Sequence, residues 1–276
     1  MKSIRDTQIR FIGAGNMATS LISGLLNKGF NTAHIKATNP NYNQREYIRK
    51  KYNIQVFDDN NEHFGWPDVV VMAVKPQVMK TALTEIRDNI HHTQPVVVSV
   101  AAGITTAQMQ AWLQQPTAII RTMPNTPAAI GQGAIGMFAN PHVSDTQRQM
   151  CEQMMDAMGT SVWVTEETDM DIVTALSGSG PAYFFTFIKA MQTAAEELGL
   201  SAKNARLLTQ QTAVGAALLA ERSDLTMAEL IDQVTSPQGT THAALTRFHE
   251  LNINDIVKQA VGAACQRSAE LSSDSN

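Results

Sequence analysis

The chain has 276 residues, of which 43% are apolar and 17% charged, with a formal net charge of −4 and a pI of about 6.0. This length predicts two domains with substantial cores, and the interspersed, slightly acidic charge argues against nucleic-acid and membrane partners. The two cysteines, Cys151 and Cys265, lie far apart and outside any CxxC pair, so we expect a cytoplasmic protein without a disulfide framework or zinc. No apolar run approaches the ~18 residues of a membrane span, and the first ten residues lack the apolar core of a signal peptide.

Short apolar strands alternate with helical segments along the first part of the chain. We expect strands at Ile9–Gly13, His34–Thr38, Asp68–Val74, Pro95–Val100 and Thr117–Arg121. Helices are expected between them, at Asn16–Lys28, Gln44–Lys51, Gln77–Asn89 and Thr105–Leu113. Nearly continuous apolar strands that alternate with helices indicate an α/β domain whose parallel sheet is covered on both faces.

The character of the sequence changes near Val164–Asp169, where the strand signals stop. We place a domain boundary there, between an α/β domain at 1–165 and a second, all-helical domain at 166–276. Helices of the second domain are expected at Pro181–Leu198, Ala202–Glu221, Met227–Val234, Thr240–His249 and Ile256–Leu271. Apolar, Ala/Gly-rich faces such as Thr212–Ala220 exceed what one thin layer can bury, so we expect a two-fold dimer with exchanged helices.

A glycine-rich turn joins the first expected strand to the first expected helix. It reads G-x-G-x-x-A, with Gly13, Gly15 and Ala18 in the order of the dinucleotide-binding fingerprint. Gly13 permits the tight turn, Gly15 lets the backbone approach a pyrophosphate, and Ala18 lets helix and strand pack closely. The N–H groups of Asn16 and Met17 then face the anion. The alternative is a tight strand–helix turn without a ligand.

The end of the second expected strand bears on the choice of dinucleotide. A cofactor with a free ribose usually meets Asp or Glu there, but ATNPNYNQR, Ala37–Arg45, contains no acid. Asn39 and Asn41 can donate to a 2′-phosphate, and Lys36 or Arg45 could add positive charge. This pattern favours NADP, and the alternative is a solvated turn, because Asn-Pro-Asn is good turn chemistry.

Further loops end at the same edge of the expected sheet. Lys75, followed by Pro76, either contacts the ligand or extends into solvent, and we favour contact because the carboxyl ends of strands line the ligand crevice. The segment Ser99–Thr105 has the small residues that close approach to a nicotinamide requires. Arg121 and Asn125, in the Pro-rich segment that follows, fit a structural role and a functional role equally.

Three further patterns bear on a possible site. TSPQGTTHAAL, Thr235–Leu245, leads into an amphipathic helix with hydroxyls and backbone N–H groups but no Asp, Glu, Lys, Arg or Cys. Gly178-Ser179-Gly180 is no nucleophile elbow, because no strand precedes it, and it predicts a tight helix entry. The seven histidines lack metal-ligand spacing, so no metal site is expected, and His242 is only a weak site candidate.

Six motifs together resemble the pyrroline-5-carboxylate reductase family and span nearly the whole chain in order. They are FIGAGNMA (Phe11–Ala18), AVKP (Ala73–Pro76), SVAAG (Ser99–Gly103), RTMPNTP (Arg121–Pro127), LSGSGPAY (Leu176–Tyr183) and DQVTSPQGTT (Asp232–Thr241). The last two are highly specific. The chain departs from the family where Ser236-Pro237-Gln238-Gly239 replaces the frequent Ser-Pro-Gly-Gly.

The resemblance implies an N-terminal Rossmann domain, a C-terminal helical dimerisation domain that interlocks with a second subunit, and assembly as a homodimer or decamer. It implies reduction of 1-pyrroline-5-carboxylate to L-proline, the last step of proline biosynthesis, with NAD(P)H as the hydride donor. The residues Ala37–Arg45 favour NADPH, with NADH as the alternative. With the glycine turn, the resemblance places cofactor contacts at Ile12, Gly13, Ala14, Gly15, Asn16, Met17, Asn39, Asn41, Asn60, Ala73, Val74, Lys75, Pro76, Ala102 and Gln233. Substrate contacts are expected at Glu167, Asp224, Ser236, Gly239, Thr240 and Thr241, often from the neighbouring subunit.

The implied substrate, a cyclic imine with a carboxylate, explains the uncharged stretch before the helix. Ser236, Gly239 and Thr240 can bind the carboxylate at a helix start without an arginine, and the hydroxyl of Thr241 can lie beside the ring nitrogen as the catalytic group. Because a cyclic imine is itself basic, the site needs orientation and one hydrogen-bond partner rather than a strong acid.

Two other functions remain as alternatives. A 3-hydroxyacid dehydrogenase of similar build would have a lysine a few residues after Gly-x-Gly, but Lys189 comes too late after Gly180. A nonenzymatic NADP-binding sensor would need no substrate loop, so Ser236–Thr241 argues against it. Turnover of pyrroline-5-carboxylate separates the three.

Overall fold

The computed structural model describes residues 3–274, and it divides the chain into two compact units. The first unit is residues 1–179 with 264–276, and the second is residues 180–263. This division differs from the boundary expected at 165. Residues 166–179 belong to the first unit because the helix α7 (Asp169–Val173) packs within it. Met170 of this helix is buried, and Asp171 accepts a hydrogen bond from the hydroxyl of Ser268 at 2.7 Å.

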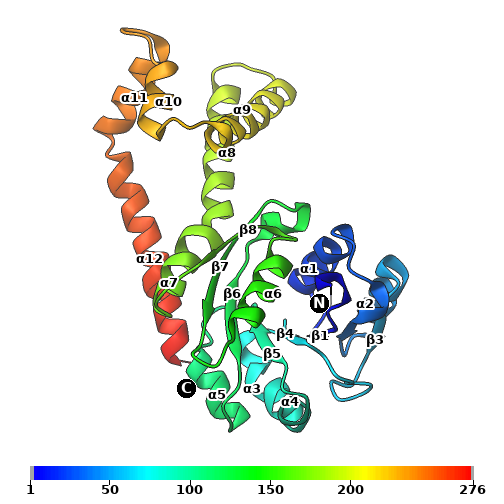
Figure 1. Cartoon of the computed structure of the whole chain (residues 1–276). Helices are drawn as coiled ribbons and strands as arrows, with labels where there is room; N and C mark the ends of the chain where they lie inside the picture. Colours follow the sequence, from blue (N-terminus) through cyan, green and yellow to red (C-terminus); the bar gives the residue numbers. More distant parts are fainter. Residues whose placement is uncertain (1–2, 275–276) are drawn as a thin grey trace. The chain divides into compact units, whose positions relative to one another are not determined.

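An eight-stranded sheet forms the centre of the first unit (Figure 1). Its strands run in the order β3-β2-β1-β4-β5-β6-β7-β8, and only β7 lies antiparallel to its neighbour β6. Their bounds are β1 Ile9–Ile12, β2 Ile35–Thr38, β3 Gln55–Phe57, β4 Val69–Met72, β5 Val96–Ser99, β6 Ile119–Met123, β7 Gly133–Ala139 and β8 Gly159–Trp163. The order changes direction between β1 and β4, which places a ligand crevice beyond the carboxyl ends of these two strands. The expected Rossmann-type domain is confirmed.

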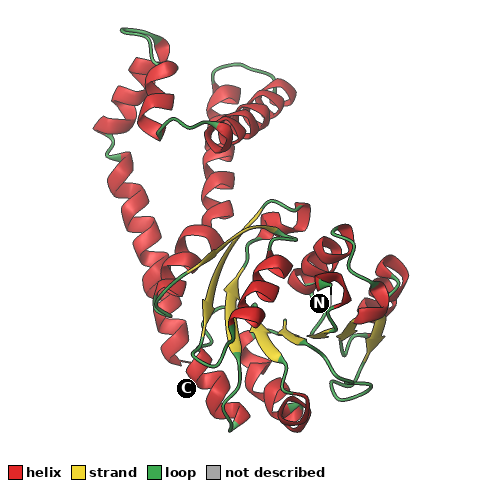
Figure 2. Cartoon of the chain, viewed as in Figure 1, coloured by secondary structure: helices red, strands yellow, loops and turns green. Residues whose placement is uncertain are grey.

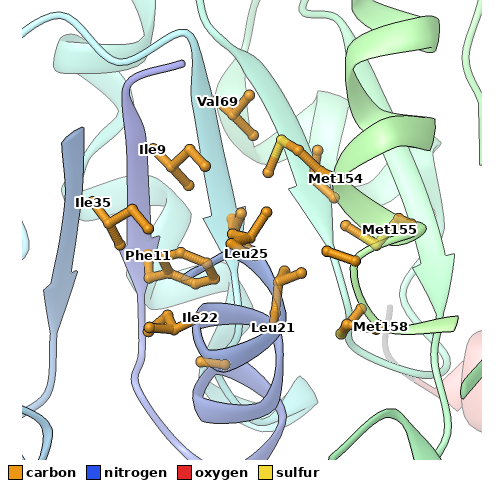
Figure 3. Close-up of a cluster of buried hydrophobic side chains, with 14 of the residues drawn as sticks. Ile9, Phe11, Leu21, Ile22, Leu25, Ile35, Val69, Met154, Met155 and Met158 are labelled. Carbon is orange, nitrogen blue, oxygen red and sulfur yellow. The ribbon is translucent and has the colours of Figure 1, made fainter. Parts of the chain in front are cut away.

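Helices cover both faces of this sheet. They are α1 Asn16–Asn27, α2 Tyr42–Tyr52, α3 Pro76–Glu85, α4 Arg87–Thr93, α5 Thr106–Leu113 and α6 Asp145–Met155. Alternate strand residues face opposite sides, so Phe11 and Val71 pack with α1, α2 and α6, whereas Val70 and Met72 pack with α3, α4 and α5. Figure 3 shows the first of these clusters, where Leu21 and Leu25 of α1 lie near Met154, Met155 and Met158.

The sequence-based expectations lack three strands, β3, β7 and β8, and two α-helices, α6 and α7. The strand β3 has only three residues, and β7 (GAIGMFA) contains two glycines, which lower its apolar density. The strand β8 alternates half-buried and exposed residues and includes two hydroxyl side chains. The single helix expected at Gln77–Asn89 is two helices, α3 and α4, which meet at Ile86.

The second unit is helical throughout its described residues (Figure 2). Its helices are α8 Gly180–Glu197, α9 Ala202–Arg222, α10 Met227–Gln233, α11 Thr240–Glu250 and the first part of α12 Ile253–Asp274. Apolar side chains of this unit are extensively exposed in the single chain, among them Phe184 at 71% and Leu198 at 89%. None of the helices that the structure describes has the length and apolar character needed to cross a membrane.

Candidate functional site

The glycine turn between β1 and α1 has the geometry of an anion-binding turn. Gly13 has φ +87°, and a Cβ there would lie 2.7 Å from the carbonyl oxygen of Ala73, so only glycine fits without strain. A Cβ at Gly15 would meet no atom within 4 Å. No described side chain caps α1, and its first N–H groups, including those of Asn16 and Met17, are available for an anion.

The predicted neighbours of this turn are held in place by backbone groups. The N–H of Ala73 donates to the carbonyl of Ile12 at 2.8 Å, which joins the ends of β1 and β4. The carbonyl of Ala14 accepts from Asn39 Nδ2 at 3.2 Å and from Gln44 Nε2 at 3.1 Å. The loop after β2 is therefore fastened directly to the glycine turn.

The polar groups expected at a 2′-phosphate are partly engaged elsewhere. Asn39 Oδ1 accepts from the N–H of Asn41 at 2.8 Å, and Asn41 Oδ1 caps α2. Arg45 is buried and donates to the carbonyls of Asn39 and Pro40, both at 2.9 Å, while Lys36 donates to the carbonyl of His63 at 3.2 Å. Both cations are thus engaged with backbone carbonyls, and their contribution of positive charge near a phosphate stays a prediction. Two donors remain for a phosphate. One is the N-terminus of α2, and the other is the exposed Nδ2 of Asn41, which makes no hydrogen bond within residues 3–274.

The loops after β4 and β5 lie at the same edge of the sheet. Lys75 precedes α3, whose first residue is Pro76, and its exposed amine makes no ion pair with any residue described. Val74 Cγ1 lies close to Gly13, which places the β4 loop against the glycine turn. After β5, Ala102 is half-buried, and Gly103 has φ +72° beside Leu271 of α12. Four of the predicted contact regions thus meet at one edge.

Glu167 has a structural role that sequence reasoning missed. Its carboxylate accepts from the N–H and the hydroxyl of Thr106, both at 2.7 Å, and pairs with Arg121 at 2.9 Å. A negative charge at the start of α5 is favourable, and the guanidinium of Arg121 is buried. Both carboxylate oxygens are therefore engaged within the first unit, which assigns Arg121 a structural role, and the substrate contact of Glu167 stays a prediction.

Asn125 and the Gly-Ser-Gly segment are also structural. Asn125 donates to the carbonyl of Ser177 at 3.0 Å and accepts from the N–H of Ala134 at 3.0 Å. The segment Thr174–Gly178 is π-helical, and a Cβ at Gly178 would lie 2.6 Å from Met123 Cε. The glycine permits this close approach, as a tight helix entry requires.

The predicted substrate loop lies in the second unit, before α11. Gly239 is the N-cap of α11, no side chain of the described chain caps this end, and Thr241 is half-buried. The N–H groups of Thr240, Thr241 and His242 are the first of the helix and lack intrahelical partners. The N–H of Gly239 is not available to a ligand, because it donates to the carbonyl of Ser236 at 3.0 Å. A Cβ at Gly239 would collide with the hydroxyl of Ser236, so glycine lets this turn close as it does.

Two further predicted residues of this unit are exposed. Asp224 lies between α9 and α10, and Gln233 is the last residue of α10. Gln238, where the family often has glycine, adopts φ +59°. Glycine is favoured in this left-handed conformation, which explains the family preference and shows that glutamine accepts the same turn.

Two known protein families match this chain, one in its N-terminal part and one in its C-terminal part. Residues 167–271 match the family described as pyrroline-5-carboxylate reductase dimerisation, so the chain contains a region for self-association. Residues 8–103, which include the glycine turn, match the family described as NADP oxidoreductase, coenzyme F420-dependent.

Individual relatives match over nearly the full length. Pyrroline-5-carboxylate reductase of Pseudomonas aeruginosa is 48% identical over 264 residues, which is 96% of each chain. The structure of a pyrroline-5-carboxylate reductase from Coxiella burnetii is 39% identical with a TM-score of 0.93, covering 97% of this chain and 99% of that one. Plasmodium falciparum pyrroline carboxylate reductase with NADP bound is 26% identical with a TM-score of 0.86, covering 98% and 100%. This chain belongs to the pyrroline-5-carboxylate reductase family.

Proposed function

We propose that this protein reduces 1-pyrroline-5-carboxylate to L-proline, using a hydride from a reduced nicotinamide dinucleotide. The observation that supports this most is that one chain combines the open turn at Gly15 with the uncapped, uncharged start of α11. The turn suits a pyrophosphate, and the helix start suits a carboxylate. Together they fit a reductase that binds a small carboxylate substrate through backbone N–H groups rather than through a charged side chain.

The residues before and within α11 bind and orient the substrate. The N–H groups of Thr240, Thr241 and His242 and the helix dipole hold the carboxylate. The hydroxyl of Thr241 hydrogen-bonds the ring nitrogen. When bound, the reduced nicotinamide supplies the hydride that adds to the imine carbon. The ring nitrogen must be or become protonated. Because a cyclic imine is itself basic, the chain supplies position and one hydrogen bond rather than a strong acid.

The experiment that tests the activity is a turnover assay with pyrroline-5-carboxylate and NADPH. Oxidation of NADPH with formation of proline is expected. Oxidation of a 3-hydroxyacid with NADP⁺ instead would indicate a dehydrogenase, and NADPH binding without turnover of any of these compounds would indicate a sensor. Either of these outcomes contradicts the proposal.

Thr241→Ala tests the catalytic assignment within that assay. Loss of one hydrogen bond to a group of developing charge lowers kcat/KM by roughly ten- to 150-fold. Thr246→Ala is the matched control, because this exposed hydroxyl on the same helix donates only to the carbonyl of His242. Normal kinetics with a lowered Tm in Thr241→Ala would remove Thr241 from the site and leave it as a helix-start residue.

The preference for NADPH is part of the proposal. It is supported by the absence of an acid in Ala37–Arg45 and by the exposed amide of Asn41 at the start of α2. Asn39→Asp introduces a negative charge beside the expected 2′-phosphate, so the ratio of kcat/KM for NADPH to that for NADH falls about tenfold. An unchanged ratio would show that Asn39 serves only the turn.

Assembly completes the proposed site. We infer that the second unit forms a two-fold dimer, which covers its exposed apolar side chains and lets one subunit contribute substrate contacts to the other. A decamer built from such dimers is the larger form that we propose. Sedimentation analysis distinguishes dimer, decamer and monomer.

A further inference from the structure

The side chain of Thr38, at the carboxyl end of β2, connects the glycine turn to a distant loop. Thr38 is 1% exposed. Its hydroxyl oxygen accepts from the N–H of Gly13 at 3.2 Å, and the hydroxyl donates to Asn60 Oδ1 at 2.6 Å, with the carbonyl of Phe11 as a longer second acceptor at 3.3 Å. One buried hydroxyl therefore provides a hydrogen-bond partner both for the N–H of Gly13, in the glycine turn, and for the side chain of Asn60, a predicted cofactor residue.

The backbone of the loop that carries Asn60 is fixed independently. Arg10 of β1 is 1% exposed and donates to the carbonyls of Asp59, Asn60, Glu62 and His63 at 2.8–3.5 Å. Burial lowers the pKa of Arg10 to about 10, which leaves it charged at neutral pH. Charge-assisted bonds to several carbonyls hold the loop firmly, so the remaining freedom of Asn60 is the orientation of its side-chain amide.

Two groups hold that side chain. On one side Thr38 donates to Oδ1, and on the other Asn60 Nδ2 donates to Glu85 Oε2 at 2.8 Å. A flipped amide would turn Oδ1 toward the carboxylate of Glu85, which cannot donate, so the flip is disfavoured. The Nδ2 group still has a second hydrogen to offer a ligand.

We infer that Thr38 is a positioning residue for the dinucleotide, which it serves by fixing the Gly13 amide and the Asn60 side chain before the ligand binds. The inference rests on the proposed cofactor contacts of Gly13 and Asn60. Residues already oriented lose less entropy on binding. A valine at 38 has nearly the same shape but leaves the Gly13 N–H and Asn60 Oδ1 without their partner.

The test is a titration of NADPH by fluorescence into the full-length wild-type protein and its variants. Thr38→Val should raise the Kd for NADPH roughly five- to thirtyfold, as loss of one or two hydrogen bonds implies, while kcat at saturating NADPH stays within about twofold. Thr38→Ser keeps the hydroxyl and should restore most of the affinity. If Thr38→Val fails to fold, Thr38→Ala removes the hydroxyl with less added apolar surface and gives the same comparison.

Thr117→Val is the matched control. Thr117 is also buried, and its hydroxyl donates to the carbonyl of Gln115 at 3.1 Å. Thr117 precedes β6, so it lies at the edge of the sheet opposite the glycine turn. This variant should lower Tm without changing the Kd. A wild-type Kd in Thr38→Val, or an equal rise in Thr117→Val, would overturn the inference.

A double-mutant cycle with Asn60→Ala tests the connection itself. If Thr38 acts through Asn60, the two changes together raise the Kd by less than the product of their separate effects. Full multiplication would overturn the connection to Asn60. Because these measurements report binding, a protein that binds NADPH but does not reduce pyrroline-5-carboxylate contradicts the proposed activity alone.

Discussion

The two units of this chain differ in how much of their apolar surface they bury by themselves. In the first unit, both faces of the sheet are covered, and Phe11 is 0% exposed within the larger core cluster. In the second, large side chains such as Phe184 are mostly exposed in the single chain. The first unit has its own core, whereas the second requires another surface, and a matched family named for dimerisation fits that requirement.

The largest expected effect lies in the core of the first unit. Phe11→Ala removes a fully buried ring, so the free energy of unfolding should fall by about 3–5 kcal/mol. Denaturant titration measures it, and the loss should not depend on protein concentration. Phe184→Ala, at an exposed position, is the control and should change the unfolding of the first unit little. Similar losses at both sites would contradict the difference between the units.

The next expected effect concerns association through the second unit. Val257 is exposed on α12 and lines an apolar groove with Phe187 and Phe248. Val257→Asp would bury a charge in an interface, so the dimer dissociation constant should rise by roughly a hundredfold or more. Asn254→Asp adds the same charge at an exposed polar position of α12 and serves as the control. Sedimentation at micromolar concentration measures both, and an active wild-type monomer would refute the dimer.

A smaller effect separates folding from binding within the glycine turn. Gly15→Val places its side chain in open space, so the protein should keep its Tm while the KM for NADPH rises about tenfold or more. Gly13→Ala instead meets the carbonyl of Ala73 at a positive φ and should lower Tm. An unchanged KM in Gly15→Val would remove the turn from the cofactor site.

The smallest expected effect is in the substrate loop. Gln238→Gly relieves a left-handed conformation, although glycine loses more chain entropy on folding, so stability should rise by at most about 1 kcal/mol. Thermal unfolding should show a slightly higher Tm, and the Kd for NADPH should not change. A lower Tm would show that the glutamine side chain itself stabilises the loop.

Local patterns sufficed for much of the fold and part of the site. Short runs rich in apolar residues identified β1, β2, β4, β5 and β6, and the spacing of Gly13 and Gly15 identified the turn. Strands such as β8 were missed because one half-exposed face weakens the apolar signal. The helix α6 does carry a local signal in the sequence, because Ser144 and Gln147 form a capping box.

The roles of charged side chains could not be read from the sequence. Glu167 meets Thr106 across 61 positions, and Arg45 turns back to the carbonyls just before α2. Such contacts depend on which elements the fold brings together. A residue type in a motif predicts that a group is present, but the fold decides whether a ligand can reach it.

The discontinuity of the first unit has a consequence for synthesis on the ribosome. Residues 180–263 lie between its two segments, so its last helical turns, with Ser268 and Leu271, are made only after the whole second unit. At about 5–20 residues per second, these 84 residues take roughly 4–17 s. During that interval the nascent sheet lacks the helix that packs beside Gly103, so the loop expected to face the nicotinamide is among the last parts of the unit to be completed.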